Sequence, residues 1–284
     1  MTLQVRLFGA FQLVEQGQLV KWSALPRTTP LLAYLLLNQA TPLARDAVAF
    51  ALWPDMGEAE ARSNLRRHLH DLRRALPAAS AAQPWLLADS DSIQWNPANN
   101  VWVDALLFAA LSADPQKLGE AVALYTGDLL PNLYDDWLLF HRERLRTLLV
   151  DDLVQLVQQR HAAQDYPHAL AYAQQILQHE PLREDAVRWL MTLRHESGDR
   201  TGALQEYHRF AQRLREALDV PPMVETSALY DTIARQLVAP APPPTPAALP
   251  AASAPAAADE WQIPGNLPAQ LTTFSQAMSP RVVR

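Results

Sequence analysis

Basic and apolar side chains recur with helical spacing over residues 58–76, EAEARSNLRRHLHDLRRAL. The leucines are separated by four, three and four residues, which is typical of a helix that buries one face. The remaining positions are polar and mostly arginine, and Asp71 is the only acidic residue between Arg62 and Leu76. A guanidinium group pairs with a phosphate or a guanine edge through two parallel hydrogen bonds. This short helix is therefore suited to binding nucleic acid.

Other clusters of polar residues predict neither catalysis nor metal binding. His68 and His70 lie two positions apart on the predicted helix, where side chains do not face each other, so a shared ion is not expected. The sequence contains no cysteine and none of the motifs G-x-S-x-G, H-E-x-x-H and G-x-x-x-x-G-K-[ST]. The adjacent carboxylates at 135–136 and 151–152 are expected to serve solvation and helix-start electrostatics. We expect no enzyme activity, cofactor or metal.

The composition predicts a globular protein with room for about two domains. The chain has 284 residues, of which 49% are hydrophobic, and a net charge of −6. This acidic total argues against a wholly basic coat protein or a polybasic membrane binder, so any contact with nucleic acid must be local. The longest aliphatic run, at 31–37, is far shorter than the roughly 20 residues of a membrane span. We expect a cytoplasmic protein without membrane contact.

The segments before the basic helix predict the first part of a helix-turn-helix. Alternation of apolar and polar residues up to Trp22 predicts two or three short antiparallel strands. Leu31–Asn38 is predicted to form a buried helix. Thr41 as cap and Pro42 as first helical residue predict the start of a second helix, which runs to Trp53.

The segment after the basic helix predicts a β-hairpin, with strands at 85–87 and 93–95. A winged helix-turn-helix has this order of elements. Its second helix enters the major groove, and its hairpin can contact the adjacent backbone.

Beyond residue 104 the pattern is nearly all helical and contains a repeat. DYPHAL at 165–170 and DRTGAL at 199–204 match at an offset of 34 residues, which is the period of tetratricopeptide repeats. Ala169 and Ala203 are small enough to allow close packing between helices. Such helical hairpins must stack to bury their faces. Residues 239–259 are rich in proline and alanine and predict a linker.

Several stretches of this sequence resemble one family of regulators. LQVRLFGAFQL, LLAYLLL, ARDAVAFALWPD and ARSNLRRHLHDLRRAL resemble the OmpR-type winged-helix domain of the SARP-type bacterial transcriptional activators. YTGDLLPNLYDDWLLFHRERLRTLLVDDLVQLV, HEPLREDAVRWLMTLRHESGDRTGALQEYHRF and LREALDVPP resemble the bacterial transcriptional activation domain that follows it. The resemblance extends to about Val238.

The resemblance implies a mainly α fold with a small β component. It places an OmpR-type winged-helix DNA-binding domain at 1–104, a tetratricopeptide-like activation domain at 105–238, and a linker with a disordered tail at 239–284. Within that tail GNLPAQLTTF resembles the start of the STAND-type ATPase domain of larger members, although the phosphate-binding motif is missing. An unrelated flexible tail is the alternative.

The resemblance also implies roles for single residues. Arg27 stands near the first helix, where the family typically has a basic residue, and Arg45 matches the arginine that usually opens the second helix and contacts backbone phosphate. We expect both to position the basic helix on phosphate. Asp71 departs from the family because that position is commonly basic. The wing lacks the usual glycine at its tip and carries Asp89 and Asp91 instead, which would bind phosphate poorly.

We therefore predict a sequence-specific DNA-binding transcriptional regulator. We expect it to be an activator that binds repeated half-sites of double-stranded DNA as a homodimer and recruits RNA polymerase holoenzyme. The alternative is a protein-interaction scaffold with a degenerate winged helix, which Asp71 and the acidic wing favour slightly. The predicted DNA-binding residues are Arg27, Arg45, Arg62, Asn64, Arg66, Arg67, His68, His70, Arg73 and Arg74.

Overall fold

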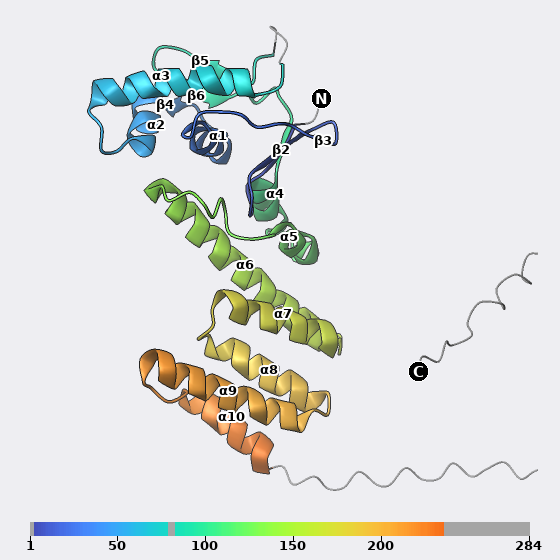
Figure 1. Ribbon diagram of the computed structural model, residues 1–284. Coiled ribbons are helices and arrows are strands. Elements are labelled where there is room, and N and C mark those ends of the chain that lie inside the picture. Colours follow the sequence, from blue (N-terminus) through green and yellow to red (C-terminus); the bar gives the residue numbers. More distant parts are fainter. Residues whose placement is uncertain (1–2, 79–82, 236–284) are drawn as a thin grey trace, which may run out of the picture. The chain divides into compact units, whose positions relative to one another are not determined.

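The computed structural model describes residues 3–78 and 83–235 and has a mainly α fold with a small β component (Figure 1). The strands are β1 (Leu3–Arg6), β2 (Gln12–Glu15), β3 (Gln18–Leu19), β4 (Leu43–Ala44), β5 (Leu86–Ala88), β6 (Ser92–Trp95) and β7 (Val101–Val103). The helices are α1 (Thr28–Leu37), α2 (Arg45–Leu52), α3 (Glu58–Ala75), α4 (Asp104–Leu111), α5 (Leu118–Leu124), α6 (Asp136–Ala162), α7 (Tyr166–His179), α8 (Glu184–Glu196), α9 (Arg200–Leu218) and α10 (Val224–Arg235). The predicted linker, and the stretch that resembles an ATPase start, lie outside the described residues.

The first sheet has the strand order β3-β2-β1-β7. The short antiparallel strands predicted before Trp22 are confirmed and number three, with Leu3 opposite Glu15 in β1 and β2. Strand β7 pairs in parallel with β1, in the register Leu3 to Val101. Strand β7 is not predicted by the local sequence pattern, because its partner β1 lies at the other end of the winged helix.

The second sheet forms the wing and has the order β4-β6-β5. The predicted hairpin is confirmed, with Leu86 of β5 opposite Trp95 of β6. The predicted start of the second helix at Thr41 and Pro42 is wrong, because residues 43–44 form β4 against β6. The backbone N–H of Arg45 then donates to the Asp91 carbonyl at 2.9 Å, and α2 begins at that residue.

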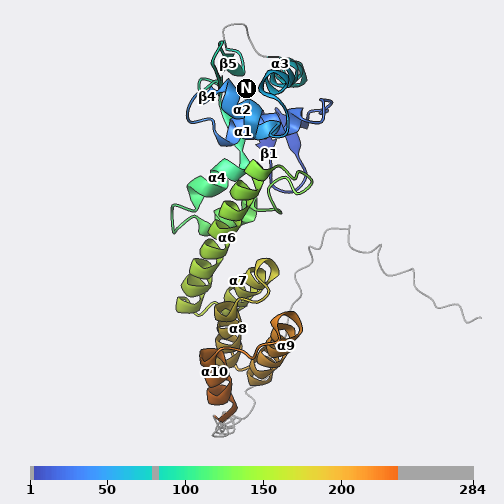
Figure 2. The same ribbon diagram turned by 90° about the vertical axis from the view of Figure 1, so that its left-hand side faces the viewer.

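Helices α1, α2 and α3 form the helix-turn-helix on these sheets (Figures 1 and 2). The predicted leucine face of α3 is confirmed, because Leu65, Leu69 and Leu72 are each at most 2% exposed. Helix α1 begins three residues earlier than predicted, at Thr28, and is buried along most of its length. The buried leucine face packs α3 against the core, so the opposite side of the helix is exposed to solvent.

A buried carboxylate joins the winged helix to the helices that follow. Asp104, at the start of α4, accepts hydrogen bonds from the backbone N–H groups of Leu7, Phe8 and Ala105 at 2.7–3.0 Å. The N–H of Leu130 donates to the Leu7 carbonyl at 2.8 Å. The described residues form one compact unit with a core that continues from β1 into α8. The division at residue 104 stays a prediction.

Helices α6 to α10 pack as successive antiparallel hairpins, as the repeat predicts. Ala169 in α7 and Ala203 in α9 are fully buried, and the two helices begin at equivalent positions of the 34-residue repeat. Asp199 caps α9 by accepting from the Gly202 N–H at 2.8 Å. Among the described helices, none is both long and apolar enough to cross a membrane.

Two of the carboxylates expected to serve solvation are largely buried instead: Asp135, whose side chain is 6% exposed, and Asp152. Asp152 in α6 is 1% exposed and accepts a hydrogen bond from Ser112 Oγ at 2.5 Å. Burial raises the pKa of Asp152 to about 6, because removing the charged form from water is unfavourable. Asp151 beside it is exposed, as expected.

The buried carboxyl should make stability depend on pH. The pKa of Asp152 in the folded state, about 6, lies above its ordinary value of 3.8. Between these values the folded state holds a proton that the unfolded state has lost, so the free energy of unfolding falls as pH rises through this window and stays lowered above it. The substitution Asp152→Asn should therefore raise the urea midpoint at pH 7.5 and do so less at pH 5. Glu143→Gln, at an exposed position on α6, is the control, and equal shifts for both variants at both pH values would contradict the prediction.

Candidate nucleic-acid interface

Helix α3 presents basic side chains opposite its buried leucines. Its first turn carries Glu58 and Glu60 and its last turn Arg73 and Arg74, an arrangement that complements the helix dipole. The exposed basic residues along the helix that make no ion pair with any described residue are Arg66, Arg67, His70, Arg73 and Arg74. These five predicted residues therefore lie together on one accessible surface, which we call the basic face.

Arg62 and Asn64 lie at the start of α3 but have partners within the protein. The guanidinium of Arg62 donates to both carboxylate oxygens of Asp46 at 2.6 Å and lies 2.9 Å from Glu58 Oε1. The hydrogen bond from Arg62 holds the pKa of Asp46 below its usual value. Asn64 Nδ2 lies 3.0 Å from the sulfur of Met56. Both residues thus help to hold α3 beside α2 and the turn.

His68 does not fit the predicted role of a DNA contact. Its side chain is only 8% exposed, and its ring packs on Trp53 with centroids 5.3 Å apart. Nδ1 lies 3.0 Å from the Thr28 hydroxyl. Burial lowers the pKa of His68 and favours the neutral ring. The prediction is corrected: His68 packs between α3, α1 and the end of α2.

Asp71 turns its carboxylate toward α1. Its Oδ2 accepts from the backbone N–H of Leu25 and from the Thr28 hydroxyl, both at 2.8 Å. The Leu25 hydrogen bond is the main reason that the pKa of Asp71 is lowered. An acidic group at a helix N-terminus is favourable. The acidic residue at a commonly basic position thus joins α3 to the start of α1.

The acidic residues of the wing shape its turn. The Asp89 carboxylate accepts from the N–H groups of Asp91 and Ser92 at 2.8 and 2.7 Å, and from the Ser92 hydroxyl at 2.9 Å. These bonds lower the pKa of Asp89 and fold the tip as an Asx turn, which tolerates the absence of glycine. Arg45 Nη1 donates to the Asp89 carbonyl at 2.8 Å. Arg45 therefore joins the start of α2 to the wing.

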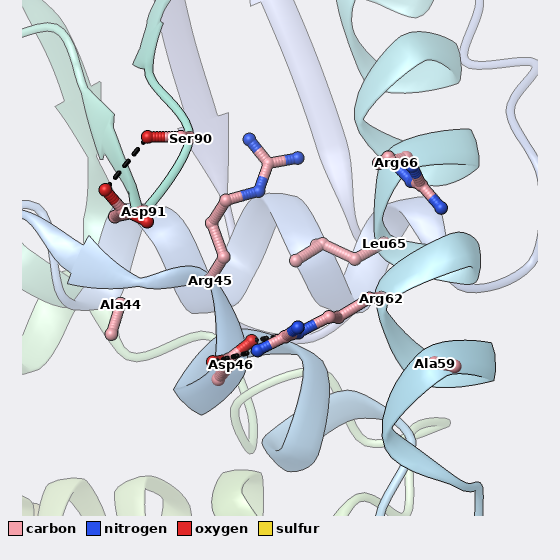
Figure 3. Close-up of a pocket in the computed structure, with 9 residues that line it drawn as sticks. All are labelled: Ala44, Arg45, Asp46, Ala59, Arg62, Leu65, Arg66, Ser90 and Asp91. Carbon is pink, nitrogen blue, oxygen red and sulfur yellow. Dashed lines mark hydrogen bonds and ion pairs between the residues drawn. The ribbon is translucent and has the colours of Figure 1, made fainter.

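A groove of about 740 Å³ lies between α2, α3 and the wing. Its lining includes Arg45, Arg62 and Arg66 together with Ser90 and Asp91 (Figure 3). In this view Arg45 lies between the wing and α3, while Arg62 reaches across to Asp46. The groove brings together three of the predicted DNA-binding residues, Arg45, Arg62 and Arg66, of which Arg62 is paired with Asp46.

Arg27 lies apart from this groove. Its guanidinium forms an ion pair with Asp135, whose side chain is 6% exposed, just before α6. It lines a second groove with Phe50, Tyr134 and Trp137. The predicted phosphate contact of Arg27 stays a prediction, and its guanidinium also links the winged helix to the start of α6. Sequence spacing could not show this, because the partners are 108 residues apart.

The structure shows no candidate metal site within residues 3–78 and 83–235, where no group of three or more histidine and acidic residues could hold an ion. The candidate site consists of the basic face of α3, Arg45 and the wing.

The chain is similar in sequence to known transcriptional regulatory proteins. Residues 107–234 match the model of the bacterial transcriptional activator domain. The transcriptional regulatory protein MoaR1 of Mycobacterium tuberculosis is 26% identical over 252 residues, which cover 83% of this chain and 80% of MoaR1. The transcriptional regulatory protein EmbR of the same species is 25% identical over 251 residues, 82% of this chain and 64% of EmbR.

A solved structure also shares the fold. Mycobacterium tuberculosis EmbR in complex with a low affinity phosphopeptide has a TM-score of 0.64 to this chain and 23% sequence identity. The match covers 82% of this chain and 65% of the EmbR chain. The similarity extends over both the winged helix and the helical domain, which confirms the predicted fold class.

Proposed function

We infer from the membership of this chain in the SARP-type transcriptional regulators that it binds double-stranded DNA with α3 in the major groove. The observation that carries this proposal is the basic face, whose five side chains are exposed and have no ion-pair partner among the described residues. Arginine forks recognise phosphates and guanine edges. Arg45 would bind the phosphate backbone from the groove beside the wing.

We further propose that the protein activates transcription as a pair of copies on repeated half-sites and recruits RNA polymerase holoenzyme. The helical domain supports this role, because stacked helical hairpins provide extended surfaces for proteins. The scaffold alternative was favoured by Asp71 and the acidic wing. Both Asp71 and Asp89 are occupied by internal hydrogen bonds, so neither is evidence for a degenerate DNA-binding surface.

The first test is a gel-shift titration on the DNA upstream of the chain's own gene, with scrambled DNA of the same length beside it. Each neutralised phosphate should contribute about −0.9 to the slope of log affinity against log salt. Selective binding that weakens steeply with salt is expected. Equal, weak binding to both DNAs would contradict the proposed function.

Arg45→Ala should weaken binding to both DNAs by a similar factor and reduce the salt slope by about 1, because a phosphate contact carries no sequence information. The measurement is the same titration over a series of salt concentrations. Arg144→Ala, an exposed arginine on α6, is the control. A loss of selectivity with an unchanged salt slope would instead mean that Arg45 reads a base.

A further inference from the structure

Arg62 differs from the other arginines of α3 because carboxylates hold its guanidinium. Its Nε and Nη2 donate to the two carboxylate oxygens of Asp46 on α2, each at 2.6 Å, and Nη2 also lies 2.9 Å from Glu58 Oε1. The other arginines of the helix, at positions 66, 67, 73 and 74, have no ion-pair partner within the described part of the chain. This difference indicates a role that a fixed arginine performs better than a free one.

The Arg62 side chain belongs to the groove between α2, α3 and the wing. It lines that groove together with Arg45 and Arg66 (Figure 3), and it is 50% exposed. In the proposed function Arg45 binds the phosphate backbone from the same groove. Arg62 would therefore lie against the DNA that α3 contacts.

The ion pair with Asp46 leaves one end of the guanidinium free. Asp46 occupies the edge formed by Nε and Nη2, while Nη1 makes no hydrogen bond with any described residue. The contact between Nη2 and Glu58 joins two exposed side chains, and such surface pairs are weak. The second hydrogen of Nη2 can therefore exchange its partner. Nη1 and Nη2 then form the fork that donates to O6 and N7 of guanine.

The charge around Arg62 favours a base over a phosphate. One guanidinium faces the carboxylates of Asp46 and Glu58, so the group is acidic overall. The hydrogen bond from Arg62 lowers the pKa of Asp46 and keeps that carboxyl charged. An acidic group repels the phosphate backbone, whereas the guanine edge is uncharged and requires two donors.

A fixed guanidinium also suits the recognition of a single base. A side chain that is already held by two hydrogen bonds loses little further freedom on binding, and its planar fork presents donors in one direction. Asp46 is itself placed by the start of α2, where the Arg45 N–H donates to the Asp91 carbonyl at 2.9 Å. The orientation of Arg62 is thus set by α2 and the wing.

We propose that Arg62 reads a guanine of the operator through Nη1 and Nη2, and that Asp46 is a positioning residue that holds Arg62 in the reading orientation. This inference rests on the proposed function, because it assigns part of the sequence selectivity to one side chain of α3. Asp46 would touch no DNA, and yet its carboxylate would influence which sequence is bound.

The first test compares affinities for the operator and for scrambled DNA of the same length by gel-shift titration. Arg62→Ala should lower the affinity for the operator about 10-fold or more, as the loss of a bidentate base contact predicts, and should change the affinity for scrambled DNA by no more than about twofold. Arg62→Lys should lose the same selectivity, because an ammonium group keeps the charge but not the fork.

Asp46→Asn tests the positioning role. It should lower the ratio of operator affinity to scrambled-DNA affinity, although the loss of a negative charge strengthens binding to scrambled DNA. Glu60→Gln, at an exposed position in the first turn of α3, is the matched control. It removes one negative charge and leaves the Arg62 pair intact, so both affinities should rise by the same factor.

A second measurement identifies the base that Arg62 contacts. Single guanines of the operator are replaced by 7-deazaguanine, which lacks the N7 acceptor. At one guanine the wild-type chain should lose affinity by about fivefold or more, because a donor is left without its acceptor. Arg62→Ala should bind the modified and unmodified operators equally, since the same contact is not lost twice.

The outcomes separate this inference from the proposed function. Selective binding by the wild-type chain that Arg62→Ala retains would overturn the inference alone. So would an equal loss on both DNAs with a lowered urea midpoint, because Arg62 would then only hold α3 against α2. An unchanged ratio in Asp46→Asn would overturn the positioning role. Equal binding of the wild-type chain to operator and scrambled DNA would overturn the proposed function and this inference with it.

Discussion

Replacing Arg66 and Arg67 together by alanine should lower the affinity for the operator by roughly 100-fold, because each lost base or phosphate contact costs about 1–3 kcal/mol. Both side chains lie on the basic face, and neither has an ion-pair partner among the described residues. Their removal should leave the fold unchanged, because surface substitutions rarely alter stability by more than about 0.5 kcal/mol.

The measurement is a gel-shift titration of the double variant beside the wild-type chain at fixed salt. The matched control is Arg144→Ala/Arg215→Ala, which removes two exposed arginines from α6 and α9 and changes the net charge equally. If both double variants lose the same affinity, general electrostatic attraction and not α3 would account for binding, and the assignment of the basic face would be wrong.

Asp104→Ala should lower the free energy of unfolding by about 3–5 kcal/mol, because it leaves several buried N–H groups without an acceptor. In the folded chain these groups belong to Leu7, Phe8 and Ala105. A loss of this size is a large part of the stability of a typical domain, about 5–15 kcal/mol. Urea unfolding at pH 7.5, followed by circular dichroism, would measure it.

Asp104→Asn distinguishes the hydrogen bonds from the volume of the side chain. It keeps the shape but places an amide NH₂ group where an acceptor is needed, so a comparable loss is expected. Asp151→Ala, at an exposed position on α6, should change stability little. If the Asp104→Asn variant were as stable as the wild-type chain, the hydrogen bonds that the carboxylate accepts from Leu7 and Phe8 would not account for the stability of this region.

The elements with strong local patterns could be predicted from the sequence. The leucine spacing of α3, the hairpin of the wing and the 34-residue repeat each depend on neighbouring residues. The position of His68 could also have been found, because it lies three residues after Leu65 and four before Leu72, on the buried stripe. Its polar type led to the prediction of an exposed side chain instead.

The remaining features depend on partners far along the chain. Strand β4 forms because Leu43 meets Ile93, and β7 because Val101 meets Leu3. The ion pair between Arg27 and Asp135 likewise depends on tertiary packing. No periodicity within a single segment indicates such pairs.

Two acidic residues have roles that differ from those predicted by the sequence. Asp71 and Asp89 are predicted to weaken contact with DNA, whereas in the structure both accept hydrogen bonds from backbone N–H groups. The Asx turn at Asp89 is local and could have been predicted from the Asp-Ser-Asp-Ser order. The role of Asp71 could not, because the N–H that it accepts from belongs to Leu25, 46 residues earlier.

The placement of β1 also has a consequence for synthesis of the protein. Strand β1 is synthesised first. The Asp104 carboxylate, which accepts from the Leu7 N–H at the end of this strand, lies 97 residues after Leu7, and the Leu7 carbonyl accepts from the N–H of Leu130. Contacts between such distant residues form slowly, and a ribosome adds only about 5–20 residues per second. The nascent chain therefore spends seconds with one edge of β1 unpaired, and it completes its first sheet only when Val101–Val103 have emerged.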